Sequence, residues 1–112
     1  MARRADVLVI RRRLGFGAEG RRERFAVLQS DLLTDMETVI VAPLDDSASM
    51  YEDDPLAVHA SPKEAGTRGG QVVLVHLVAA VRLDRFESVA SGRLSPKTMN
   101  HVDDALRTAL EL

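Results

Sequence analysis

Short apolar runs alternate with polar or glycine-containing segments over the first two thirds of the chain. Runs of about four to eight apolar, often β-branched residues are typical of buried strands. The pattern predicts strands at residues 5–10, 25–29, 38–42, 56–60, 71–81 and 88–94. The 71–81 run is long for one strand and is expected to bend near Leu77. Pro43 is expected to end the regular pairing of the 38–42 strand, because proline has no N–H to donate.

The segments between these runs are expected to be loops and short turns. Residues 11–24 contain three glycines and many charges, which favours a long loop. Residues 61–70 combine glycine, proline and charge, and are also expected to form a loop. Short helical turns are expected at 32–33 and 83–86.

The end of the chain has the spacing of an amphipathic helix. Ser95 is a good N-cap and Pro96 suits the first helical position. Apolar residues then recur at helical spacing, at Met99, Val102, Leu106, Ala109 and Leu110. Several strands followed by one helix predict a mainly β fold with a C-terminal helix (α+β). The expected architecture is a small, curved antiparallel β-barrel closed by that helix.

Length and composition restrict the class of protein. The chain has 112 residues, which suits one ordinary domain spanning residues 1–112. It contains no cysteine, which excludes disulfides, thiolate nucleophiles and thiolate zinc sites. No apolar run approaches the length of a membrane span, and the N-terminus lacks a signal-peptide core. We therefore expect a soluble cytoplasmic protein that does not bind membranes.

Charge is unevenly distributed although the formal net charge is only −2. Eight arginines occur in the first quarter, at Arg3, Arg4, Arg11, Arg12, Arg13, Arg21, Arg22 and Arg24. Acidic residues concentrate in the second quarter, between Asp31 and Asp54. This separation favours a basic face that binds a polyanion, unless the two blocks fold against each other and cancel.

The stretch from Gly17 to Asp31 combines a charged loop with the start of an expected strand. Arg21, Arg22 and Arg24 lie where the loop turns into that strand. A junction between an adaptable loop and a rigid strand suits groups that must be held still. Arginine there favours phosphate, because its planar fork offers paired donors and keeps its charge. A solvated hairpin turn is the alternative interpretation.

Several motifs resemble, in the right order, those of the MazF/PemK family of toxin endoribonucleases, which are related in fold to the gyrase poison CcdB. Arg-Ala-Asp-Val at 4–7 resembles the family's R-G-D-V, and Gly-Ala-Glu at 17–19 resembles its G-S-E. RFAVL at 24–28 resembles R-P-x-L-V, and TVIVAPL at 38–44 matches almost letter for letter. GRLSP at 92–96, followed by VDDAL at 102–106, resembles the family's C-terminal pattern.

The resemblance implies a single MazF-like toxin domain with an SH3-like barrel, the CcdB/MazF-like fold. It also implies a homodimer, an RNA substrate bound in a groove at the dimer interface, and a cognate antitoxin with a MazE-like acidic tail. The implied chemistry needs no metal and no cofactor. The 2′-hydroxyl attacks the neighbouring phosphorus, leaving 2′,3′-cyclic phosphate and 5′-OH ends.

Individual positions can be weighed against this chemistry. Arg24 falls on the family's catalytic arginine, and a dianionic transition state needs a fixed cation. Glu19 matches the loop glutamate and is expected to orient Arg24, although an exposed loop acid is an equal alternative. The remaining arginines of the loop are expected to bind RNA phosphates, namely Arg12, Arg13, Arg21 and Arg22.

Asp45 departs from the family, which usually carries serine or threonine at this position. A carboxylate cannot donate to the scissile phosphate unless it is protonated, and repulsion by phosphate favours the protonated form. An ionised Asp45 would instead accept the 2′-hydroxyl proton, or Ser47 would supply the missing hydroxyl. A merely solvated Asp45 is the remaining alternative.

Two further departures concern the substrate. Residues 77–80 read LVAA where the family often has Q-I-R-T, so conventional base recognition is not expected. This difference favours another RNA, for example a structured one such as tRNA, recognised by its shape and a single-stranded loop. Phe25 replaces the usual proline and is expected to pack in the core rather than to stack on a base.

The three histidines do not form an obvious site. His76 lies in an apolar run and is expected to be a buried structural residue. His59 is expected to face a groove, and His101 to be solvated on the last helix. No pair of histidines has the spacing of metal ligands.

The leading hypothesis is a sequence-specific, metal-independent endoribonuclease toxin. One alternative is a CcdB-like, non-enzymatic toxin that binds DNA gyrase, which the changes at Asp45 and at 79–80 favour. The other is a degenerate family member that only binds its antitoxin.

Overall fold

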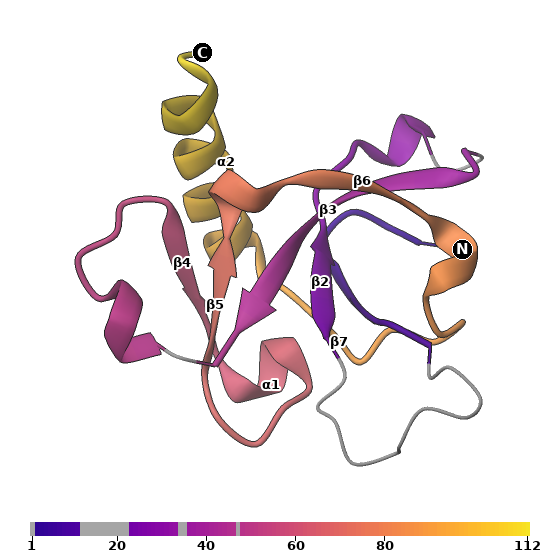
Figure 1. The fold of residues 1–112 in the computed structure, drawn as a ribbon, viewed down its shortest axis with the longest axis horizontal. Helices are drawn as coiled ribbons and strands as arrows, with labels where there is room; N and C mark the ends of the chain where they lie inside the picture. Colours follow the sequence, from indigo (N-terminus) through magenta and orange to yellow (C-terminus); the bar gives the residue numbers. More distant parts are fainter. Residues whose placement is uncertain (1, 12–22, 34–35, 47) are drawn as a thin grey trace.

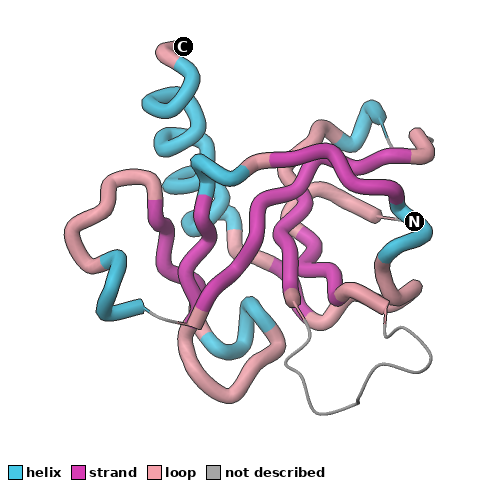
Figure 2. Tube along the Cα trace, viewed as in Figure 1, coloured by secondary structure: helices cyan, strands magenta, loops and turns pink. Residues whose placement is uncertain are grey.

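The computed structural model describes residues 2–11, 23–33, 36–46 and 48–112 (Figure 1). Strands, helices and short 3₁₀ turns follow one another along the chain (Figure 2). The strands are β1 (Asp6–Val9), β2 (Arg24–Val27), β3 (Thr38–Asp45), β4 (Ala57–Ala60), β5 (Gln71–Leu74), β6 (Ala79–Arg82) and β7 (Gly92–Arg93). The helices are α1 (Pro62–Ala65) and α2 (Pro96–Leu110), and the 3₁₀ turns are η1 (Asp31–Leu33), η2 (Ala48–Tyr51), η3 (Val75–Leu77) and η4 (Leu83–Arg85).

The strands form one curled sheet in which every described pair is antiparallel. The order is β4-β5-β3-β2-β1-β7, and β6 pairs separately with β3. One edge of β3 therefore pairs with β2, whereas the other edge pairs first with β6 and then with β5. A strand that changes partner along its length makes the sheet curl into a half-barrel, with α2 against it (Figure 1). The predicted mainly β fold with a C-terminal helix is confirmed.

The expectation that Pro43 ends the pairing of β3 is wrong. Pro43 lies inside the strand and pairs with Phe25 of β2. Leu28 N–H donates to the Ile40 carbonyl, and this sets the alternation of bonded and non-bonded pairs. Hydrogen-bonded and non-hydrogen-bonded pairs alternate along β2 and β3, so Pro43 and Phe25 form a non-hydrogen-bonded pair. The nitrogen of Pro43 therefore faces away from β2, toward the edge of β3 that pairs with β6 and β5. On that edge β6 pairing has ended at 41 and β5 pairing begins at 44, so no ladder bond is lost.

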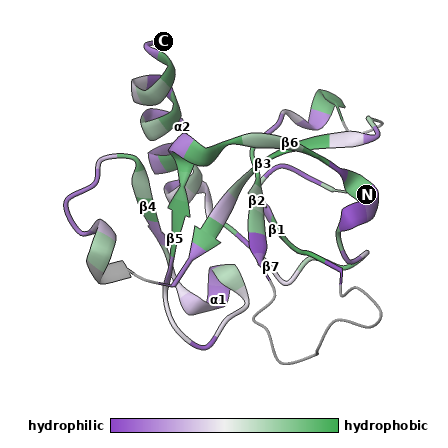
Figure 3. Cartoon of the chain, viewed as in Figure 1, coloured by the Kyte–Doolittle hydropathy of each residue, from purple (hydrophilic) through white to green (hydrophobic). Residues whose placement is uncertain are grey.

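Apolar residues form two core clusters on the two sides of the sheet, and hydrophobic ribbon follows β5 and β6 (Figure 3). The larger cluster joins the sheet to α2 and includes Val7, Ala26, Ala42, Val58, Val73, Val75, Met99, Val102 and Ala105. The smaller cluster surrounds Phe86 and includes Leu8, Val27, Val39 and Val41. Both faces of the centre of β3 are covered, and Val41 and Ala42 there are fully buried.

Helix α2 begins as the sequence predicts. The Ser95 hydroxyl accepts from Thr98 N–H at 3.2 Å, and Pro96 occupies the first turn. Met99 and Val102 are buried, whereas Leu110 is 54% exposed. The last turn of α2 extends beyond the sheet (Figure 1), so the apolar stripe packs against the core only as far as Leu106.

The described part of the chain also corrects two sequence expectations and confirms a third. Residues 61–70 contain α1 rather than only loop. The strand expected at 88–94 is reduced to β7, and the 71–81 run divides into β5, η3 and β6, as its expected bend near Leu77 implied. The missed signal for α1 was a capping box, in which Ser61 and Glu64 bond each other's backbone N–H groups.

No helix among the described residues is long and apolar enough to cross a membrane.

A glycine contact fixes α1 against β7. A Cβ on Gly92 would lie 2.0 Å from the backbone carbonyl oxygen of Glu64. The Ser91 hydroxyl donates to the Ala65 carbonyl at 3.0 Å, which holds the same two segments together. Only glycine at 92 permits this approach without moving α1.

Gly92→Ala is therefore expected to lower the free energy of unfolding by about 1–3 kcal/mol, because the carbonyl must move. Gly69→Ala is the matched control, since a Cβ there meets nothing within 4 Å. Urea unfolding of both variants checks this. Equal stability of the two variants would contradict the contact.

Glu64 connects the beginnings of both helices. Its carboxylate accepts from Ser61 N–H at 3.0 Å and from Ser95 N–H at 2.8 Å, the N-caps of α1 and α2. Burial acts to raise the pKa of Glu64, but hydrogen bonds from the Thr98 side chain and the Ser61 and Ser95 backbones outweigh it and lower the pKa to about 2.

Glu64→Gln is expected to cost about 1–2 kcal/mol of unfolding free energy at pH 7, allowing for solvent screening. The folded-state pKa lies below the unfolded value of 4.5, so this stability is complete above about pH 4.5 and is lost as pH falls toward 2. Urea unfolding between pH 3 and pH 7 measures the difference, with the exposed Glu37→Gln as control. A pH-independent difference would contradict the assignment.

Candidate active site

Arg24 and Asp45 occupy the adjoining ends of two paired strands. Arg24 is the first residue of β2 and lies opposite Leu44 of β3, and Asp45 is the last residue of β3. Both side chains are half-buried, so neither is enclosed in the core. The hydrogen-bonded register brings an arginine and a carboxylate to one end of the sheet.

The two side chains nevertheless leave their strands on different faces. Arg24 and Ala26 share the face of Leu44 and Ala42, which belongs to the core beside α2. Asp45 follows Leu44 and therefore leaves on the opposite face.

Tyr51 is a site residue that sequence reasoning missed. The short turn η2 brings it back toward β3, and its hydroxyl donates to Asp45 Oδ2 at 3.1 Å. This hydrogen bond, followed by burial and the charges of Asp45 and Asp54, raises the pKa of Tyr51 above its usual value. The hydroxyl is thus a fixed donor at neutral pH. Its six-residue separation from Asp45 carried no recognisable motif.

Six of the proposed site residues lie outside the described ranges. They are Ser47, Glu19, Arg12, Arg13, Arg21 and Arg22. Their expected contributions, a hydroxyl, an orienting carboxylate and phosphate contacts, remain predictions.

Two arginines of the first quarter, Arg4 and Arg11, bind groups of the fold with their side chains. The Arg4 guanidinium binds the Leu28 carbonyl and the Asp103 carboxylate of α2. Arg11 Nε donates to the Phe86 carbonyl at 2.7 Å. Asp31 accepts from the Arg4 backbone N–H at 2.7 Å, so acidic and basic blocks do meet here, but not as paired side chains.

Phe25 and His76 had been assigned to the interior. Phe25 is half-buried and packs edge-on against Phe86, with 5.6 Å between ring centroids, which confirms its core role. His76 is exposed in η3, and the prediction of a buried structural histidine is wrong. The apolar run turns at this point, so the chain leaves the sheet and the histidine faces solvent.

The altered segment at 77–80 forms part of the surface. Leu77, Ala79 and Ala80 are exposed, and Ala80 pairs with the exposed Ile40 of β3. Only Val78 packs against the core. The residues that differ from the usual Q-I-R-T therefore change a surface rather than the packing.

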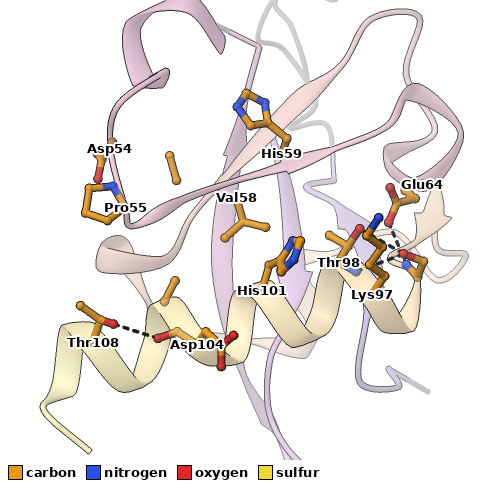
Figure 4. A pocket seen from close by; sticks show the side chains of 13 residues that line it. Asp54, Pro55, Val58, His59, Glu64, Lys97, Thr98, His101, Asp104 and Thr108 are labelled. Carbon is orange, nitrogen blue, oxygen red and sulfur yellow. Dashed lines mark hydrogen bonds between the residues drawn. The ribbon is translucent and has the colours of Figure 1, made fainter.

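An open groove of about 670 Å³ lies between β4 and α2. His59 of β4 and His101 of α2 both line it, and Glu64 and Lys97 mark one end (Figure 4). Both histidines are exposed, as expected. Neither Arg24 nor Asp45 lines the groove, so it is separate from the strand-end site. Among the described residues, no group of three or more His, Asp or Glu could hold a metal ion.

Solved structures of MazF toxins share this fold. A mycobacterial endoribonuclease in complex with its cognate antitoxin superposes with a TM-score of 0.77 and 21% identity, over 100% of this chain and 97% of that one. The Mycobacterium tuberculosis toxin MazF-mt6 superposes with a TM-score of 0.76 and 13% identity, over 96% of this chain and 97% of that one. A MazE–MazF structure from Deinococcus radiodurans superposes with a TM-score of 0.73 and 18% identity, over 99% of this chain and 97% of that one. These likenesses confirm the predicted CcdB/MazF-like fold class.

Sequence comparison identifies the family directly. No curated protein matches the chain significantly. The family model for the PemK-like, MazF-like toxin of type II toxin–antitoxin systems matches residues 3–110. The chain therefore belongs to the PemK/MazF family of type II toxins.

Proposed function

We propose that this toxin is a sequence-specific endoribonuclease that cleaves RNA without a metal ion, leaving 2′,3′-cyclic phosphate and 5′-OH ends. The observation that carries the proposal is the placement of Arg24 and Asp45 at adjoining ends of β2 and β3. The names of two similar structures, both endoribonucleases, support the same activity.

Arg24 supplies the fixed positive charge in this mechanism. Charge accumulates on the non-bridging oxygens as the 2′-oxygen attacks phosphorus, and a guanidinium held by a strand stabilises it without reorganising. The very high pKa of arginine suits it to this task rather than to proton transfer.

Asp45 accepts the proton of the attacking 2′-hydroxyl. The O2′–P bond forms, the P–O5′ bond breaks, and the departing 5′-oxygen takes a proton from water. Serine or threonine at this position would donate a hydrogen bond, so its replacement by Asp45 moves this position from donor to base. Ser47 as a replacement hydroxyl is the competing assignment.

The partners follow from the family and remain part of the proposal. The toxin acts as a homodimer in the cytoplasm and is inhibited by an acidic antitoxin segment, as the antitoxin complexes among its structural neighbours suggest. The arginines that contact RNA phosphates are Arg12, Arg13, Arg21 and Arg22, and Glu19 orients Arg24. We assign residues 1–112 to a single toxin domain.

The substrate is proposed to be a structured RNA such as tRNA. The exposed surface formed by Leu77, Ala79 and Ala80 offers no side-chain hydrogen-bond donors. It therefore does not read base edges in the way that a glutamine or arginine does. Recognition then depends on RNA shape and on a single-stranded loop.

Arg24→Ala is expected to reduce the single-turnover cleavage rate at least about 100-fold, because one preorganised charge contact is lost in the transition state. The assay uses purified protein and total cellular RNA in EDTA, with mapping of cyclic-phosphate ends. Arg107→Ala is the control, since Arg107 is an exposed residue of α2 that pairs with Asp104 at 3.0 Å.

The absence of cyclic-phosphate ends with wild-type protein would overturn the endoribonuclease proposal. Growth arrest with intact RNA and damaged DNA would then select the CcdB-like alternative, in which the toxin binds DNA gyrase. If the wild-type protein is not toxic when it is expressed without an antitoxin, the alternative of a degenerate family member that only binds its antitoxin is selected.

Asp45→Asn is expected to slow cleavage about 100-fold while RNA binding is retained, because the amide keeps the shape but cannot accept the proton. Ser47→Ala should leave the rate near that of wild type. Rates and RNA affinities measured side by side distinguish the assignments. If Ser47→Ala greatly lowers the cleavage rate while Asp45→Asn stays active, the catalytic role passes from Asp45 to Ser47.

A further inference from the structure

We propose that Tyr51 is a positioning residue of this site, which orients the Asp45 carboxylate so that it receives the 2′-hydroxyl proton. This inference rests on the proposed function. It adds a residue that neither the family motifs nor the sequence pattern identifies. The carrying observation is the hydrogen bond from the Tyr51 hydroxyl to Asp45 Oδ2 at 3.1 Å.

The need for such a residue follows from the position of Asp45. It is the last residue of β3, so only one side of it is held by the regular strand. The terminal torsion of an aspartate side chain has a broad energy well, and burial of this residue is only partial. A hydrogen bond to one carboxylate oxygen restricts that torsion and sets the direction of the carboxylate.

Tyr51 is itself held by the structure. Its backbone carbonyl accepts from Asp54 N–H at 3.1 Å, and the Asp54 side chain accepts from Leu56 N–H at 2.9 Å. Ala57, the first residue of β4, donates its N–H to the Asp54 carbonyl at 3.2 Å. The backbone of Tyr51 is therefore linked by hydrogen bonds to the start of β4.

The hydroxyl faces negative charge and stays protonated. Asp45 accepts its hydrogen bond, and the charges of Asp45 and Asp54 both act to raise the pKa of Tyr51. A group held as a donor cannot also serve as the base. In the reaction the 2′-hydroxyl proton therefore passes to Asp45, while Tyr51 keeps its own proton and its contact with the carboxylate.

The departure at position 45 gains a physical explanation from this pair. The family's serine or threonine brings its own hydroxyl and needs no orienting partner. A carboxylate in the same place needs a donor to fix it, and Tyr51 provides one from the segment that follows β3. Tyr51 and Asp45 then function as one unit, so their substitutions should not be additive.

A double-mutant cycle tests the inference. Tyr51→Phe keeps the ring and removes only the hydroxyl, and it is expected to lower kcat roughly tenfold with little change in KM. In an Asp45→Asn background the same change should have almost no further effect on kcat. An Asp45→Thr background, which restores the usual hydroxyl, should likewise make Tyr51→Phe silent.

Thr108→Val is the matched control. It removes a hydroxyl that donates to the Asp104 carbonyl at 3.1 Å within α2 and takes no part in the Tyr51–Asp45 hydrogen bond. Thermal unfolding of all variants verifies that they are folded, and kcat of this control should match wild type.

The outcomes separate this inference from the function on which it rests. If wild-type protein cleaves RNA and Asp45→Asn does not, but Tyr51→Phe cleaves like wild type, the role of Tyr51 is overturned and the endoribonuclease proposal stands. If Tyr51→Phe lowers kcat by the same factor in the wild-type and Asp45→Asn backgrounds, the positioning role is also overturned, because the hydroxyl then acts independently of Asp45. A wild-type protein that does not cleave RNA overturns both.

Discussion

The pairing of β3 along both of its edges is the constraint on which the rest of the structure depends. β2 occupies one edge, whereas β6 and β5 share the other in succession. The change of partner curls the sheet, and alternation along its strands directs side chains into the two core clusters on its two faces. It also explains how Pro43 is tolerated in the middle of the strand, since its missing donor falls at the point where neither partner requires one.

The same strand sets the position of the chemical groups. Because β3 ends at Asp45 and β2 begins at Arg24, their pairing brings a carboxylate and a guanidinium to one end of the sheet. Alternation along the strands directs the two side chains to different faces of the sheet. Tyr51 contacts Asp45 at the end of β3 because the chain turns back through η2 immediately after β3.

The two helices are held by other polar contacts. The Glu64 carboxylate bonds the N-caps of α1 and α2, and Gly92 allows α1 to approach β7 within a distance that any side chain would prevent. These contacts explain part of the family's C-terminal motif in physical terms. Gly92 permits close backbone packing. The Ser95 hydroxyl caps α2, and the Ser95 N–H donates to the Glu64 carboxylate.

The sequence alone determined the element types that depend on local patterns. Residues 95–110 were predictable as a helix because capping and periodicity are local, and most strands followed from their apolar runs. The ordered motifs also led to Arg24 and Asp45. Short α1 was recognisable from its capping box but was missed, because the surrounding glycines and proline favoured a loop.

Only the tertiary structure decided the properties that depend on partners distant in sequence. The exposure of His76, the pairing of Pro43, the use of Arg4 to bind α2, and the contact of Tyr51 with Asp45 all depend on where the sheet turns and which edge is free. A local pattern reports the conformation that a segment prefers. It does not report which groups from other segments will lie within hydrogen-bonding distance, because that is set by the curl of the whole sheet.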